Sequence, residues 1–283
     1  MSILTRRHFL AAGSGLLLPV CSTAAAASAY GRRVLEKKPC GYWRLGEMAG
    51  TTVVADASGN GLNGSVSGEV ALGEKGVLDK EKDAAAKFDG RAGGCIEIPD
   101  HPSLSQPTSG QGFTVEAWMR PDDLEFTGGE GSEGYIHWLG KGETGRQEWA
   151  LRFYPKDSSR PNRVSAYIFN PGPGLGSGAY VEEHLKPGRW IHIVATFDPG
   201  DATSPKAGVS IYKDGKLALG PAKSPGALYK TYGVMPVHGS APLRIGTRDK
   251  KNFFTGAIDE VAIYPRVLTT REITENYRAG QAG

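Results

Sequence analysis

A two-residue alternation of apolar side chains constrains the fold of this chain more than any other feature of its sequence. In residues 113–121 (FTVEAWMRP), every second side chain from Phe113 to Met119 is apolar. Successive side chains of a strand point to opposite faces of its sheet, so these side chains would share one face. Residues 189–198 (RWIHIVATFD) alternate in the same way, and their second face is half apolar, which predicts a strand covered on both sides.

Glycine marks the turns between such strands. The chain has 40 glycines among 283 residues, which at about 14% is roughly twice the usual share. They are spread along the chain rather than gathered in one tract. Asp214-Gly215 stands between two strand-like segments and suits the positive φ angles of a tight hairpin turn. So many turn residues predict a β-rich fold.

One helix is expected, at the C-terminal end. Thr269 and Glu272 have the spacing of a capping box, Ile273 and Tyr277 lie four residues apart, and Gly280 can end the helix. About a dozen short strands with turn signals between them are typical of a β-sandwich. The sequence therefore predicts an all-β fold, a two-sheet antiparallel jelly-roll sandwich with a short C-terminal helix.

The N-terminal segment has the parts of an export signal. Arg6 and Arg7 are followed by an apolar run, 9–20, and by the small residues 27–29 of a cleavage site. TRRHFL resembles a twin-arginine signal. A general secretory signal is the alternative, and bulky Val20 disfavours a lipoprotein anchor on Cys21. We expect residues 1–29 to be a twin-arginine signal peptide and 30–283 to be one domain, exported to the periplasm, the cell surface or the exterior.

Removal of that segment changes the charge and the cysteine count. The balance of 33 Lys+Arg against 30 Asp+Glu falls to 31 against 30, which is too weak to indicate nucleic-acid binding. The apolar run 9–20 is shorter than the about 20 residues of a membrane span. No transmembrane segment is expected in the mature chain either. Cys40 and Cys95 remain, and an oxidising compartment allows them to form a disulfide. Two buried free thiols are the alternative.

A glycine-rich segment, 55–68 (ADASGNGLNGSVSG), offers oxygen ligands at close spacing. Asp56, Asn60 and Asn63 are short oxygen-bearing side chains, and the glycines between them free backbone carbonyls. Such a set suits a hard cation such as Ca²⁺, which takes six to eight oxygens. The alternative is an Asx-Gly turn without metal.

A series of segments in fixed order carries a family resemblance. It comprises ADASGNGLNGSVSG, KFDG, GGCIEIP, FTVEAWMRP, LGKGE, EWALRFY, PGRWIHIVATFD, VSIYKDGK, LRIGTRD and FFTGAIDEVAIYPRVLTTREI. From about Cys40 to Tyr277, the chain resembles laminin-G-like domains of the concanavalin A-like lectin/glucanase superfamily. The resemblance implies a jelly roll in which Asp259 joins Asp56, Asn60 and Asn63 around a structural Ca²⁺. Pairing of Asp259 and Glu260 with Arg248 or Arg266 is the alternative.

The superfamily includes glycosidases and lyases, but the motifs of these enzymes are missing. The chain lacks an ExDxE strand, HExxH and GxSxG. His137, in YIHWL, resembles the strand histidine of alginate-lyase jelly rolls, but without the accompanying Gln and Arg/Tyr motifs. We therefore expect no catalytic residues, although acidic residues paired across strands are not visible in a sequence.

Glycan binding needs aromatic platforms beside polar groups. The strands expected at the concave face offer Trp138, Trp149, Tyr154 and Tyr167, with core packing as the alternative. We expect an exported, non-catalytic module that binds a glycan or an extracellular or surface protein. A glycoside hydrolase or polysaccharide lyase is the first alternative, and a structural or adhesion protein is the second.

Overall fold

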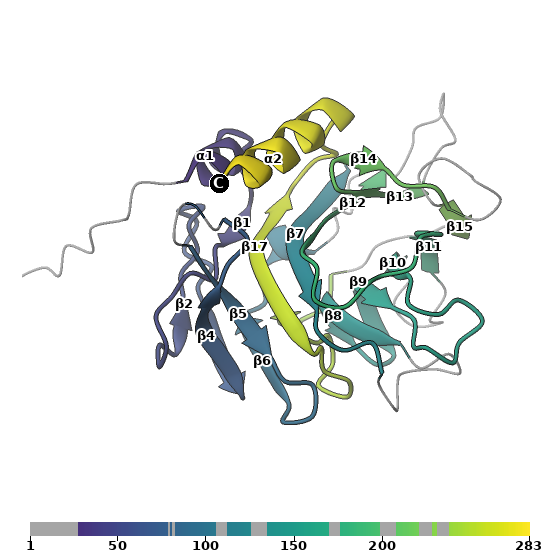
Figure 1. The fold of residues 1–283 in the computed structure, drawn as a ribbon, viewed down its shortest axis with the longest axis horizontal. Coiled ribbons are helices and arrows are strands. Elements are labelled where there is room, and N and C mark those ends of the chain that lie inside the picture. The colour runs from purple at the N-terminus through teal and green to yellow at the C-terminus, as the bar shows by residue number, and fades with distance from the viewer. Residues whose placement is uncertain are drawn as a thin grey trace, which may run out of the picture.

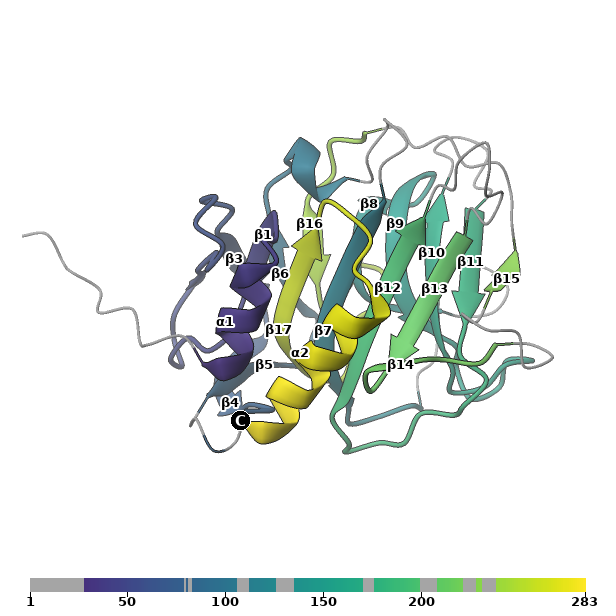
Figure 2. The ribbon, with the colours of Figure 1, turned by 90° about the horizontal axis from the view of Figure 1, so that it is seen from above.

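The computed structural model describes residues 28–78, 80, 83–105, 112–125, 135–169, 176–198, 208–220, 228–230 and 238–283. In this part of the chain, two antiparallel sheets form the body of the molecule (Figure 1). Two helices lie on the outer face of one sheet (Figure 2). The predicted all-β sandwich with a C-terminal helix is confirmed. Of the predicted signal peptide, only residues 28 and 29 lie within the described part.

The first sheet has eight strands among the described residues, in the order β14-β13-β12-β7-β17-β5-β4, with β1 paired to β17. These strands are β1 (Gly41–Trp43), β4 (Val70–Lys75), β5 (Ala84–Phe88), β7 (Phe113–Pro121), β12 (Ile191–Asp198), β13 (Gly208–Lys213), β14 (Lys216–Leu217) and β17 (Gly256–Tyr264).

The second sheet has nine strands within the same described ranges, in the order β15-β11-β10-β9-β8-β16-β6-β3-β2. These strands are β2 (Val53–Val54), β3 (Gly64–Gly68), β6 (Gly94–Ile98), β8 (Ile136–Glu143), β9 (Arg146–Phe153), β10 (Val164–Phe169), β11 (Gly176–Tyr180), β15 (Leu228–Lys230) and β16 (Leu243–Ile245). A short 3₁₀ helix spans Pro102–Leu104.

The predicted alternation decides which side chains enter the core. In β7, Phe113 and Met119 belong to the main core between the sheets, whereas Trp118 packs in a second apolar cluster beneath the helices. Strand β12 divides in the same way, with Ile193 in the main core and Val194 under the helices. Both strands are thus buried on both faces, as the sequence predicts for residues 189–198.

Helix α2 (Thr270–Ala282) begins at the predicted capping box of Thr269 and Glu272. It does not end at Gly280, which lies inside the helix. A Cβ on Gly280 would come within 2.5 Å of the Trp118 ring, so this glycine permits close packing of α2 on the sheet. The predicted hairpin turn is present as well, with φ of 52° at Asp214 and 73° at Gly215.

Helix α1 (Ala29–Glu36) was not expected from the sequence. Ser28 caps it by accepting a hydrogen bond from the Gly31 amide, and Tyr30 and Val34 are buried with α2 against the first sheet. The expected cleavage point after Ala29 falls at the first residue of this helix. In the described part of the chain, neither helix is long and apolar enough to cross a membrane.

Cys40 and Cys95 do not form the predicted disulfide, because both are free and buried. Cys40 precedes β1 of the first sheet and lies in the main core. Cys95 lies in β6 of the second sheet, next to the core residue Ile96, so its side chain points to the opposite face of that sheet. Burial raises the pKa of the Cys40 thiol to about 12.

Candidate functional site

Strand β17 carries a bulge in the middle of the first sheet. Between the pairs Asp259–Trp118 and Ala262–Glu116, β17 has two residues where β7 has one. One of the two is Glu260, whose φ of 52° lies in the left-handed region. Neighbouring side chains of a regular strand point to opposite faces, and a bulge redirects one of them. The bulge therefore brings the Asp259 and Glu260 carboxylates together.

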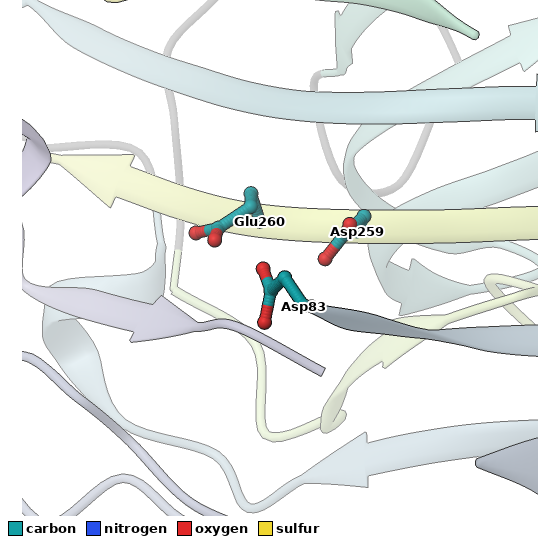
Figure 3. A group of neighbouring side chains, drawn as sticks. All are labelled: Asp83, Asp259 and Glu260. Carbon is teal, nitrogen blue, oxygen red and sulfur yellow. The ribbon is translucent and has the colours of Figure 1, made fainter. Parts of the chain in front are cut away.

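Asp83, just before β5, completes a group of three carboxylates with Asp259 and Glu260 (Figure 3). One oxygen of each lies within 4.8 Å of the others. Asp259 and Glu260 are fully buried, and Asp83 is partly buried. The Arg44 guanidinium lies 3.0 Å from Asp83 Oδ2 and 3.1 Å from Glu260 Oε1. Three ionised carboxylates and one guanidinium leave a formal charge of −2.

The hydrogen bonds of this carboxylate group are incomplete. The Val77 amide donates to Asp259 Oδ2 at 2.9 Å, and the Tyr42 hydroxyl donates to Glu260. Asp259 Oδ1 is buried without a hydrogen-bond partner among the described residues. Burial and the charge of Asp83 raise the pKa of Asp259 well above its usual value. Burial and Asp259 do the same to the pKa of Glu260.

This donor set fits a calcium ion in charge and in chemistry. Carboxylate oxygens are the ligands that Ca²⁺ prefers, and three carboxylates supply up to six of the six to eight oxygens that it takes. The formal charge of −2 matches a divalent cation. The unpartnered Oδ1 of Asp259 is a ligand atom that no described group uses.

Asp56 is the first residue of the predicted calcium set, and both of its carboxylate oxygens accept hydrogen bonds from backbone amides. Its Oδ1 accepts hydrogen bonds from the Tyr42 amide at 3.0 Å and the Ser58 amide at 2.9 Å. Its Oδ2 accepts from the Leu62 amide at 3.0 Å. These bonds are those of an Asx turn that closes the glycine-rich segment on itself.

The other predicted calcium ligands lie either in the turn around Asp56 or in the carboxylate group of Asp83, Asp259 and Glu260. The side chain of Asn63 accepts a hydrogen bond from the Asp56 amide, and Asn60 donates to the carbonyl of Cys40. Asp259 belongs instead to the group with Asp83 and Glu260, which does not include Asp56. In the sequence, Glu260 is marked only as a neighbour of Asp259, and no motif marks Asp83.

Trp138 and Trp149, two of the predicted sugar platforms, lie in the main core between the sheets. Both side chains are fully buried, and the Trp149 indole N–H donates to the Leu104 carbonyl at 2.9 Å. A sugar cannot reach either ring in this structure.

Tyr154 and Tyr167, the other two, belong to a cluster on the outer face of the second sheet, where Tyr154 is also fully buried and 6% of Tyr167 is exposed. The outer-face cluster comprises Tyr135, Arg152, Tyr154, Arg160, Tyr167 and Tyr180. The Arg152 guanidinium lies 3.7 Å from the centre of the Tyr135 ring and 4.0 Å from that of Tyr167. The Arg160 guanidinium lies 5.3 Å from the centres of both the Tyr154 and Tyr180 rings. Aromatic rings and guanidinium groups therefore lie side by side in this cluster.

His137 lies next to this cluster, paired with Arg152 across β8 and β9. It is fully buried. Burial, together with the charges of Arg248 and Arg152, lowers the pKa of His137 well below its usual value. The imidazole is therefore neutral at physiological pH.

A separate cleft of about 670 Å³ opens beside the β13–β14 hairpin. Val181, Lys213, Leu217, Leu219 and Tyr277 are among its lining residues. Leu219 is 51% exposed, so this cleft presents apolar surface at the edge of the first sheet.

Comparison with known proteins supports the fold seen here. A family model described as the concanavalin A-like lectin/glucanases superfamily matches residues 89–274. No curated protein sequence matches the chain.

Similar solved structures include domain 4 of AbnA, a GH43 extracellular arabinanase from Geobacillus stearothermophilus, in complex with arabinotriose. It has 18% identity and a TM-score of 0.57, and the match covers 85% of this chain and 98% of that one. The binding domain of Paraclostridial Mosquitocidal Protein 1 has 14% identity and a TM-score of 0.57, over 86% of this chain and 52% of the other. The chain thus spans about half the length of that toxin domain. At these identities the likeness is one of fold.

Proposed function

The chain belongs to the concanavalin A-like lectin/glucanases superfamily, and on that premise we propose that it is an exported, non-catalytic binding module for a glycan. The observation that carries the proposal is the outer-face cluster. The Tyr135 ring can stack on the C–H face of a sugar, and guanidinium groups can donate to its hydroxyls. Tyr135 and Arg160 are only half-buried, so a ligand can approach the cluster from these two residues.

The solved arabinanase domain is named as a complex with arabinotriose. That ligand belongs to the other protein, and the similarity supports a binding role for this fold without naming the sugar. Export rests on the basic, apolar and small residues of the N-terminal segment. Fractionation of producing cells tests export, because the proposal requires the mature chain outside the cytoplasm.

A structural Ca²⁺ is the second part of the proposal. Asp83, Asp259 and Glu260 would hold it, in place of the set around Asp56. The ion would neutralise the excess charge of the group. These residues would then tie the bulge of β17 to the segment before β5. The charge of the group and the unpartnered Asp259 oxygen support this assignment.

A glycoside hydrolase would also need carboxylates at close range, since retaining enzymes hold two about 5–5.5 Å apart. Asp259 and Glu260 have carboxylate oxygens within 4.8 Å of each other, but both are fully buried and Arg44 pairs with Glu260. A substrate therefore has no access to them. A surface protein is a second candidate ligand, favoured by the exposed Leu217 and Leu219 at the sheet edge.

A glycan array tests the proposed function, with product analysis on every sugar that binds. The expected result is binding without release of products. Tyr135→Ala should weaken binding, whereas Tyr135→Phe keeps the ring and should retain most of it. Cleavage of a bound glycan would show that the protein is an enzyme and would contradict a non-catalytic binding module. Absence of binding to any glycan would move the proposal to a protein ligand.

A further inference from the structure

Arg152 is the most enclosed charge of the outer-face cluster. Its side chain extends from β9, only 7% of the residue is exposed, and two tyrosine rings flank the guanidinium. Its Nε–H donates to Ser165 Oγ at 3.3 Å. A guanidinium has five N–H donors, and no described residue accepts a hydrogen bond from the Nη groups of Arg152.

Other buried cations of the same sheet each have a carboxylate partner. Lys141 lies 2.6 Å from Glu148, and Arg244 lies 3.0 Å from Glu97. In contrast, no described carboxylate lies within ion-pair distance of Arg152. An enclosed charge without a counter-charge is costly, so the absence of an acid beside Arg152 among the described residues needs a physical reason.

The surroundings of Arg152 add positive charge. Arg160 lies in the same cluster. The charges of Arg248 and Arg152 both lower the pKa of His137, although Arg248 itself lies 3.2 Å from Asp249. The guanidinium of Arg152 thus offers hydrogen-bond donors to an anion, while the tyrosine rings favour a sugar.

We propose that the glycan is acidic and that Arg152 receives the carboxylate or sulfate group of one of its sugar residues. This inference rests on the proposed function and names the ligand class for the same site. The planar guanidinium can donate two parallel hydrogen bonds to such a group. Tyr135 and Tyr167 already hold the guanidinium from both sides, so little side-chain entropy is lost on binding.

Matched acidic and neutral ligands test the inference on the unmodified protein. Titration calorimetry would compare oligogalacturonate with its methyl ester, and a heparin oligosaccharide with its desulfated form. Sulfate ion alone is included to separate sugar recognition from simple anion binding. We expect one acidic member to bind roughly tenfold or more tightly than its neutral partner, as for a charge-assisted bidentate contact.

Equal affinity within both pairs, or binding of neutral glycans alone, would overturn the inference and leave the proposed function standing. Binding of sulfate ion as tightly as the acidic glycan would also overturn it. Failure to bind any glycan on the array would remove the proposed function itself.

Variants locate the contact. Arg152→Gln should weaken binding of the acidic ligand roughly tenfold or more and leave the neutral ligand unchanged. Arg152→Lys should fall between, because it keeps the charge without the planar fork. Arg146→Gln is the matched control, since Arg146 is exposed on the same strand. If Arg152→Gln fails to fold, the ligand pairs on the wild-type protein still decide the question. Equal losses of affinity for the acidic ligand in Arg152→Gln and Arg146→Gln would contradict the assignment.

Discussion

Two buried carboxylates on the same face of the first sheet have opposite surroundings. Glu116 and Asp259 both lie beside Trp118 and are fully buried. Glu116 accepts hydrogen bonds from four side chains: Tyr30 at 2.9 Å, His192 at 2.8 Å, Tyr264 at 2.7 Å, and Asn276 at 3.0 and 2.9 Å. Asp259 has one amide donor on one oxygen and none on the other among the described residues.

The pKa values follow this difference. Burial alone would raise the pKa of Glu116, but the hydrogen bonds of His192, Tyr264 and Tyr30 outweigh it and lower the pKa. At Asp259 burial dominates, and the pKa rises. A buried carboxylate is thus stable when its acceptors are filled and needs a proton or a cation when they are not. Glu116 is a complete structural junction, whereas Asp259 belongs to an incomplete site.

Removal of Glu116 should produce the largest effect. Its donors come from both helices and from β12 and β17, so Glu116→Ala leaves several buried polar groups without an acceptor. We expect a loss of about 3–5 kcal/mol in the free energy of unfolding, measured by denaturant titration. Glu69→Ala, at an exposed position, should change stability by less than about 0.5 kcal/mol. A loss below about 1 kcal/mol for Glu116→Ala would show that the junction is not cooperative.

Asp259→Asn should raise the free energy of unfolding, whereas Glu116→Ala lowers it. The comparison is made on protein from which a chelator has removed any metal. The amide cannot ionise and keeps an oxygen for the Val77 amide, so it avoids the cost of burying an uncompensated charge and stability should rise. Asp56→Asn is the control, because both Asp56 oxygens already accept backbone hydrogen bonds, and it should lower stability. Equal destabilisation by both variants would mean that the Asp259 site is complete without a cation.

The two carboxylates should also respond oppositely to pH. Asp259 holds its proton longer in the folded state, so the metal-free protein should lose stability as pH rises from about 4 through the raised pKa. Glu116 has a lowered pKa, so its contribution should be lost as pH falls below about 4.3. Melting curves in chelator between pH 3 and 8 would show both limbs. Asp259→Asn should reduce the upper limb and leave the lower limb unchanged, with the remainder of the upper limb coming from Glu260, whose pKa burial also raises. An unchanged upper limb in this variant would assign it to another group.

The sequence was sufficient for the elements that local chemistry determines. The alternation from Phe113 to Met119, the Asp214-Gly215 turn and the capping box at Thr269 depend on nearby residues, and all three are present. Helix α1 is not predicted because its N-cap Ser28 and its first residue Ala29 lie in the expected signal peptide, although Ser28 and the pair Tyr30–Val34 are signals for it.

The carboxylate group could not be predicted for a different reason. It depends on a bulge that places Asp259 and Glu260 on one side and on Asp83, which is far away in the sequence. Alternation also cannot tell which of two apolar faces is the core, so Trp149 was considered as a ligand platform. The prediction of a disulfide between Cys40 and Cys95 is wrong because cysteine counts carry no information on which sheet each residue occupies.

Calorimetric titration of Ca²⁺ into metal-free protein would decide whether the two carboxylate sites differ as described. We expect the wild-type protein and Asp56→Asn to bind one ion each, and Asp259→Asn to bind none. Absence of a binding heat in the wild-type protein, or loss of binding in Asp56→Asn with retention in Asp259→Asn, would contradict a cation site at Asp83, Asp259 and Glu260.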